Sequence, residues 1–158
     1  MDLLFLFEWL DTSFIASLSK AYGGVFAVVQ MLHLLAMAML GGMVMVGDLR
    51  LLGVLMKDVP TETVAQQTDK WFGIALITIV VSGIFMSSAV AIKLYYNEMF
   101  WAKMIGLAFG VTFYYAIRRP LLRLDHATVN PWSLRLTAAA SLTVWLTVAA
   151  CGRWIGFS

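Results

Sequence analysis

Charged residues are scarce in this sequence, and long stretches have none. Only 13% of the 158 residues are Asp, Glu, Lys or Arg, whereas 61% are hydrophobic and the mean hydropathy is +0.86. A soluble domain of this size carries about twice that share of charge. The stretch between Lys20 and Asp48 holds no charge and is long enough, at about 40 Å of helix, to cross the hydrocarbon core of a bilayer. The composition therefore predicts an integral membrane protein.

Residues that carry chemistry are also rare. The single cysteine, Cys151, cannot form an intramolecular disulfide. No Asp or Glu lies deep in an apolar run, and no run is broken by proline, which argues against a proton or ion pathway. Metalloprotease, nucleophile-elbow and P-loop motifs are absent, so we expect no enzyme that acts by itself. The net charge of +2 does not call for a nucleic-acid partner.

Four apolar runs predict four spanning helices in a single membrane domain, 1–158. We expect these helices at about 22–51, 71–95, 98–118 and 132–157. Residues 2–19 predict an amphipathic helix in the membrane interface, broken near Asp11, with a docking helix for a partner subunit as the alternative. The expected fold class is all-α: an integral membrane four-helix bundle preceded by an N-terminal amphipathic interfacial helix. The apolar stripe of that first helix would consist of Leu3, Phe7, Leu10, Phe14 and Leu18.

Lysine and arginine are distributed unevenly between the two sides of the bundle. One side has Lys20, Lys93, Lys103 and Arg153. The side with the first and third loops has Arg50, Lys57, Lys70, Arg118, Arg119, Arg123 and Arg135. The positive-inside rule then predicts cytoplasmic first and third loops and periplasmic termini, in a bacterial inner membrane. The acidic start does not resemble a signal peptide, so we expect no cleavage.

His33 is the ionisable residue that lies deepest in an apolar run. Steps of three and four residues from it reach Gln30, Met37, Gly41 and Asp48, so we expect this stripe of the first spanning helix to face the bundle interior. A buried imidazole in a membrane either coordinates a metal or hydrogen-bonds to another helix.

A haem b site is one hypothesis for His33. At 1.5 Å per residue His33 lies about 15 to 20 Å deep, whereas Lys103 and Arg153 lie about 7 Å deep. The offset of about 10 Å suits an iron on His33 with the two propionates on Lys103 and Arg153. Met86 lies at nearly the same depth as His33 and is a candidate second ligand.

The second iron ligand is the weak point of the haem hypothesis, because the only other histidine, His126, lies in a loop at the wrong depth. A second copy of the chain in a homo-oligomer, or a five-coordinate iron, are alternatives to Met86. In the simpler structural interpretation, Lys103 and Arg153 extend to the interface and His33 only hydrogen-bonds to a neighbouring helix. Its partner would then be a backbone carbonyl or one of Thr78, Ser82, Ser141 and Thr143.

Methionines and glycines have simpler interpretations. Methionine and imidazole together suit copper, but only Met37 shares the face of His33, so copper handling ranks below haem. Gly106 and Gly110 form a G-x-x-x-G pair, which packs either within the bundle or between protomers.

The D-L-R triplet stands where the first spanning helix leaves the membrane. Asp48 could pair with Arg118, Arg119 or Arg135 from the facing helix ends, and Asp48 with Arg50 would then form a structural charge clamp. A site for a lipid or quinone headgroup is the alternative.

Three segments carry a resemblance to a known group of proteins. They are HLLAMAMLGGMVMVGDLRLLG from His33 to Gly53, NEMFWAKMIGLAFG from Asn97 to Gly110, and SLTVWLTVAACGRWIGF from Ser141 to Phe157. They resemble small uncharacterised bacterial integral membrane proteins and, more remotely, the membrane domain of copper resistance D proteins. The resemblance implies a four-helix membrane bundle. Its matching positions are His33, Asp48, Arg50, Lys103 and Arg153.

One departure from that group bears on the cofactor. Related sequences often carry a histidine at the cytoplasmic end of the third helix, where this chain reads YYAIRRP from Tyr114 to Pro120. The departure weakens a bis-histidine haem site. Two functions remain: a haem b electron carrier that exchanges electrons with quinone or a redox protein, and a non-catalytic accessory or assembly subunit in the bilayer.

Overall fold

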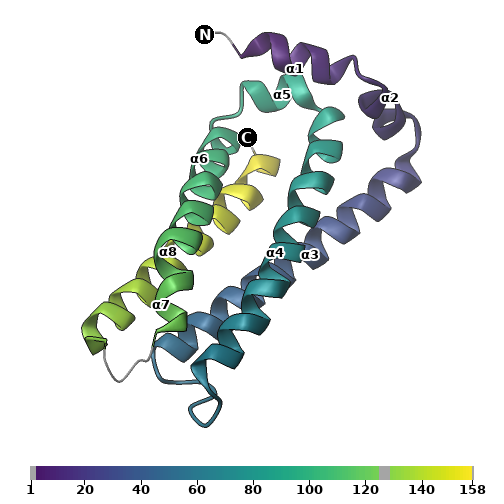
Figure 1. Cartoon of the computed structure of the whole chain (residues 1–158). Coiled ribbons are helices and arrows are strands. Elements are labelled where there is room, and N and C mark those ends of the chain that lie inside the picture. The colour runs from purple at the N-terminus through teal and green to yellow at the C-terminus, as the bar shows by residue number, and fades with distance from the viewer. Residues whose placement is uncertain (1–2, 125–128, 158) are drawn as a thin grey trace.

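The computed structural model describes residues 3–124 and 129–157, and it is helical almost throughout (Figure 1). Four segments are long and apolar enough to cross a membrane: Gly23–Leu51, Glu62–Ser88, Glu98–Arg123 and Pro131–Phe157. The expected all-α fold with four candidate membrane helices is therefore confirmed. The helices define two ends of the bundle (Figure 1). We call the end with the first and last helical turns of the chain the terminal end, and the opposite one the loop end.

The first and last of the four long segments are regular helices, and the third is built from three consecutive helical pieces. The first is α3, Gly23–Leu51, and the last is α8, Pro131–Trp154, which continues into the 3₁₀ turn η2, Ile155–Phe157. The third segment consists of α6 (Glu98–Phe113), the π-helix η1 (Tyr114–Arg118) and α7 (Arg119–Arg123). A π-turn inside a helix is rare and often marks a functional site.

The second long segment differs from the expected 71–95. Helix α4 spans Thr61–Ser88, and a separate short helix, α5, spans Ala91–Tyr95. The polar residues before Trp71 suggested a loop, but Val64, Ala65 and Thr68 are buried at helical spacing. The second spanning helix therefore begins well before its apolar run.

The long helices pack as two pairs that meet at the loop end. Helix α3 lies against α4, α6 lies against α8, and α3 also contacts α8, whereas α4 reaches the third segment mainly through α7. In Figure 1 the two pairs diverge toward the terminal end. The aromatic centre of the core lies where they converge, with Phe72 of α4 stacked on Tyr114 of η1 at 3.7 Å between ring centroids.

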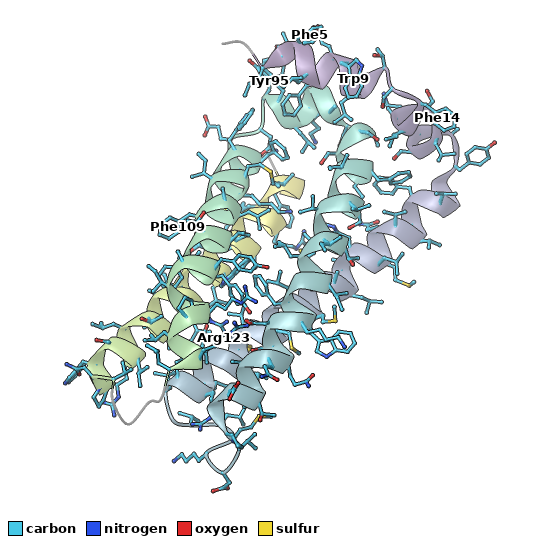
Figure 2. All side chains as sticks on the ribbon, viewed as in Figure 1. Phe5, Trp9, Phe14, Tyr95, Phe109 and Arg123 are labelled. Carbon is cyan, nitrogen blue, oxygen red and sulfur yellow. The ribbon has the colours of Figure 1, made fainter. Side chains whose placement is uncertain are left out.

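The N-terminal segment lies across the terminal end as two short helices, α1 (Leu4–Asp11) and α2 (Phe14–Ala21), so the expected break near Asp11 is confirmed. Ser13 caps α2 by accepting a hydrogen bond from the Ala16 amide at 3.2 Å. Phe7 packs on Tyr95 and Phe100, which anchors α1 to the bundle. Phe14, the first residue of α2, is 80% exposed (Figure 2), whereas Phe7 and Leu10 of α1 are partly buried.

The G-x-x-x-G pair faces α8 of the same chain. A β-carbon at Gly106 would lie 2.9 Å from Cγ2 of Val148, and one at Gly110 would lie 3.2 Å from Cγ1 of Val144. The two glycines therefore allow α6 and α8 to approach closely. The G-x-x-x-G motif therefore packs within the bundle of one chain, which is one of the two alternatives that the sequence left open.

Candidate functional site

His33 of α3 is buried against α4, with 7% of its surface exposed. Its Nδ1 lies 2.8 Å from Oγ of Ser82, and the carbonyl of Ile79 also lies beside the ring. A β-carbon at Gly83 would lie 3.5 Å from Cε1 of His33, so the imidazole packs next to the α4 backbone. Of the hydroxyl partners that the sequence offered, the structure selects Ser82.

We assign the tautomer of His33 from the hydrogen bonds of Ser82. The Ser82 hydroxyl donates to the carbonyl of Thr78, with that of Ile79 also in range, so its oxygen accepts from Nδ1–H of His33. In this tautomer Nε2 carries the lone pair. Metal-binding histidines show this arrangement, with one ring nitrogen held by a second residue and the other left for the metal.

The polar stripe expected around His33 is only partly correct. Gln30 is exposed and Met37 is 36% exposed, so neither faces the interior. The buried residues of α3 are instead His33, Ala36, Leu40, Val44, Gly47, Asp48 and Leu51. At 100° per residue these residues lie within about 60° of His33 on either side, so the direction of Met37, about 40° from His33, falls inside the arc. Helical angle alone therefore does not predict the exposure of Met37, which depends on how α3 packs against α4 and α8.

Lys103 lies in the same half of the bundle as His33. It is partly buried on α6, where a β-carbon at Gly152 of α8 would lie 3.5 Å from its Cε and Nζ. It lies close enough to His33 for a Coulombic interaction between the two side chains. No carboxylate in the described part of the chain forms an ion pair with Lys103. A cation in this position can hold an anionic group.

The other residues of the haem hypothesis have separate environments. Arg153 follows Gly152, is exposed, and lies over the ring of Phe157 at 4.4 Å. Met86 is partly buried and lies one helical turn beyond Ser82, on the same face of α4. His126 lies outside the described residues. The structure thus brings His33, Ser82 and Lys103 toward one region, whereas Arg153 is related to Lys103 only as the neighbour of Gly152 in the chain.

The methionines of α3 do not gather around His33. Met31, Met37 and Met45 are exposed, whereas Met39 and Met43 pack against the core. Within residues 3–124 and 129–157, no three His, Cys, Asp or Glu side chains come together as a metal site.

A second buried polar centre lies near the loop end. Nε of Arg118 in η1 donates to Oδ1 of Asp48 in α3 at 2.6 Å, and both side chains are 0% exposed. Nη2 of Arg118 donates to the Val44 carbonyl at 2.9 Å, and Ser141 of α8 lies beside the Asp48 carboxylate. Of the three pairings that the sequence left open for Asp48, the structure forms the one with Arg118.

Gly47 makes room for that ion pair. A β-carbon at Gly47 would overlap Nη2 of Arg118 and lie 3.0 Å from its Cζ. The ring of Tyr114 also lies against Arg118, with its centroid 4.9 Å from Cζ. The π-helix places both Tyr114 and Arg118 in the interior.

An acidic residue that the sequence analysis missed extends this centre to α4. Asp69 accepts hydrogen bonds from Oη of Tyr114 at 2.8 Å, Nε of Arg119 at 2.8 Å and Nη2 of Arg123 at 2.6 Å. It escaped notice because residues before Trp71 were assigned to a loop. The signal was the helical spacing of Val64, Thr68 and Phe72, which places Asp69 at the edge of an inward face.

Arg50 of the D-L-R triplet is not part of the ion pair between Asp48 and Arg118. Its Nη2 donates to the Val59 carbonyl at 3.1 Å and so ties the end of α3 to the loop before α4. Arg135 lies over the ring of Trp132 at 5.7 Å on α8. The charge clamp of the structure therefore joins Asp48 to Arg118, with Arg50 beside it as a loop anchor.

The fold and these two polar centres define a small all-helical protein with four candidate membrane helices and buried ionisable side chains at two levels. The chain belongs to a family of unknown function, DUF6644, whose model matches residues 6–158. The expected membership of an uncharacterised family is thereby confirmed. No curated protein and no solved structure shows a significant match, and the likeness to copper resistance D proteins is not shown.

Proposed function

We propose that this protein binds haem b through Nε2 of His33 and carries electrons in a bacterial inner membrane. The observation that supports the proposal is the hydrogen bond between Nδ1 of His33 and Ser82, since in the tautomer assigned from it Nε2 holds the lone pair. Haem bound there would supply a one-electron couple to a quinone or a redox protein. The predicted topology, with periplasmic termini, would place His33 in the periplasmic half of the bilayer.

Lys103 and Arg153 are the proposed partners of the haem carboxylates. Lys103 has an ammonium group within electrostatic range of His33 and no carboxylate partner in the described residues. Arg153 stands next to Gly152, the residue against which Lys103 lies. A cation inside the apolar part of a bundle is costly unless an anion accompanies it. Carboxylates of the cofactor would offset that cost.

Met86 is the proposed second iron ligand, because its spacing of four residues from Ser82 puts the two on the same face of α4. A second copy of the chain or a five-coordinate iron are the alternatives. Replacing Met86 with alanine separates them, since only a Met86 ligand makes the low-spin spectrum depend on that residue. Copper would show itself as a second metal in elemental analysis of the same samples.

A haem-to-polypeptide ratio tests the proposal. The protein is purified in detergent from cells supplied with ample haem, together with His33→Ala and the matched control His126→Ala. We expect haem in the wild type and the control, and its loss in His33→Ala. Lys103→Gln should lower haem retention, and Lys93→Gln, an exposed lysine near the same end, should leave it unchanged.

The second candidate function is that of a non-catalytic accessory or assembly subunit. The same hydrogen bond supports it, because the His33–Ser82 contact joins α3 to α4 without any cofactor and stabilises a bundle by about 0.6 to 2 kcal/mol. A wild-type protein without haem, in which His33→Ala changes only the stability, would favour this function over the first.

A further inference from the structure

Arg119 and Arg123 form a preoriented pair of guanidinium groups at the loop end. Both donate to Oδ2 of Asp69, Arg119 from Nε at 2.8 Å and Arg123 from Nη2 at 2.6 Å. The Asp69 side chain is only 8% exposed, whereas those of Arg119 and Arg123 are 38% and 48% exposed. The carboxylate therefore holds the two arginines from beneath while their outer surfaces remain open.

Arg119 and Arg123 together keep a net positive charge and N–H groups that can bind an anion. One carboxylate against two guanidinium groups leaves a net charge of +1, and each guanidinium commits one of its five N–H bonds to Asp69. Tyr114 takes the other oxygen of Asp69, so the carboxylate is fixed on three sides. The remaining N–H groups suit a phosphate, which arginine binds with two parallel hydrogen bonds.

The position of this pair coincides with the expected level of lipid headgroups. Arg119 and Arg123 lie at the end of the third candidate span. Cations at this end lie over exposed rings, namely Lys70 over Trp71, Arg119 over Tyr115 and Arg135 over Trp132. Aromatic residues and cations of this kind concentrate at membrane interfaces.

We propose that Arg119 and Arg123 bind the phosphate of an anionic glycerophospholipid. The net charge of +1 complements the single negative charge of a phosphodiester. Ile117 and Leu124 next to the pair are 49% and 52% exposed, which gives the acyl chains an apolar surface beside the headgroup. The site involves neither His33 nor Lys103, so it is independent of the proposed haem function.

Native mass spectrometry of the full chain in detergent tests the site. Phosphatidylglycerol and, as a neutral lipid, phosphatidylcholine are titrated against the wild type, Arg123→Gln and Lys57→Gln. Lys57 is an exposed cation of the loop between α3 and α4, so its variant removes the same charge without touching Asp69. We expect Arg123→Gln to weaken phosphatidylglycerol binding about fivefold, and Lys57→Gln to change it by less than about twofold.

Three outcomes would overturn the proposal. Equal losses in the two variants would show a diffuse charge effect in place of a site. Equal binding of phosphatidylcholine by the wild type would show that the anionic headgroup is not recognised. Displacement of phosphatidylglycerol by millimolar inorganic phosphate would assign the site to the free anion. The haem content of the same samples separates this result from a failure of the haem proposal.

Discussion

Arg118 donates from Nε to Oδ1 of Asp48 across 2.6 Å, and neither side chain has any exposed surface. This ion pair joins the π-helix of the third span to α3. Two charges removed from water are stable only together, because either one alone pays the cost of burial without its partner. The ion pair therefore stabilises the packing of η1 against α3.

Removal of one member of this pair should destabilise the protein strongly. We expect Arg118→Met to lower the free energy of unfolding by about 3 to 5 kcal/mol, because Asp48 would remain buried without its counter-ion. Denaturant unfolding in micelles measures the change. The double variant Asp48→Leu with Arg118→Met should recover most of the loss, and Arg135→Gln should stay within about 0.5 kcal/mol of the wild type. A fully stable Arg118→Met protein would contradict the role of the pair.

Gly47 should tolerate no side chain. Gly47→Ala places a β-carbon against Arg118, so the guanidinium must move away from Val44, at a cost of about 1 to 3 kcal/mol. Gly42→Ala is the control, because nothing lies within 4 Å of a β-carbon there. Thermal unfolding of the two variants side by side makes the comparison. Equal stability of the two would mean that Arg118 moves without cost.

The hydroxyl of Tyr114 should contribute through Asp69. Tyr114→Phe keeps the stacking on Phe72 but removes a hydrogen bond to a carboxylate, which should cost about 1 to 2 kcal/mol. Tyr115→Phe changes the same atom on a ring that is 42% exposed and should be close to neutral. The unfolding midpoint in detergent reports both. An effect of the same size at Tyr115 would contradict a stabilising role of the Tyr114–Asp69 hydrogen bond.

Ser82 should control the cofactor through the imidazole. Ser82→Ala frees Nδ1 of His33, so the orientation and basicity of the ring change and haem affinity should fall about 10- to 100-fold. Thr78→Ala is the matched control on the same helix, because the Thr78 hydroxyl donates only to the Ile74 carbonyl. Haem titration of the apoprotein measures both affinities. Wild-type affinity in Ser82→Ala would show that the hydrogen bond does not tune a ligand.

The sequence predicted the parts of this fold that depend on hydropathy. Long charge-free runs such as the one before Asp48 identify spanning helices, because a buried backbone in lipid must form helices or barrels. The start of α4 could not be found this way, since its first turns at the loop end are polar. The π-helix was also beyond reach, because no feature of YYAIR distinguishes it from a regular helix.

The candidate sites show the same division. His33 and Asp48 were identifiable because an ionisable side chain in an apolar run is conspicuous, and Arg118 was among the proposed partners. The choice of Ser82 over the other hydroxyls depends on how α3 crosses α4, which the periodicity of one helix does not determine. Met37 illustrates this limit, since its spacing from His33 allowed an inward position and the helix packing excludes it.

The dithionite-reduced minus oxidised difference spectrum of the purified protein tests the haem proposal most directly. We expect a b-type spectrum with a reduced Soret band in the wild type and in His126→Ala, and its complete loss in His33→Ala. A wild type that is prepared with ample haem and shows no such spectrum would contradict it, as would a His33→Ala protein that retains the full signal.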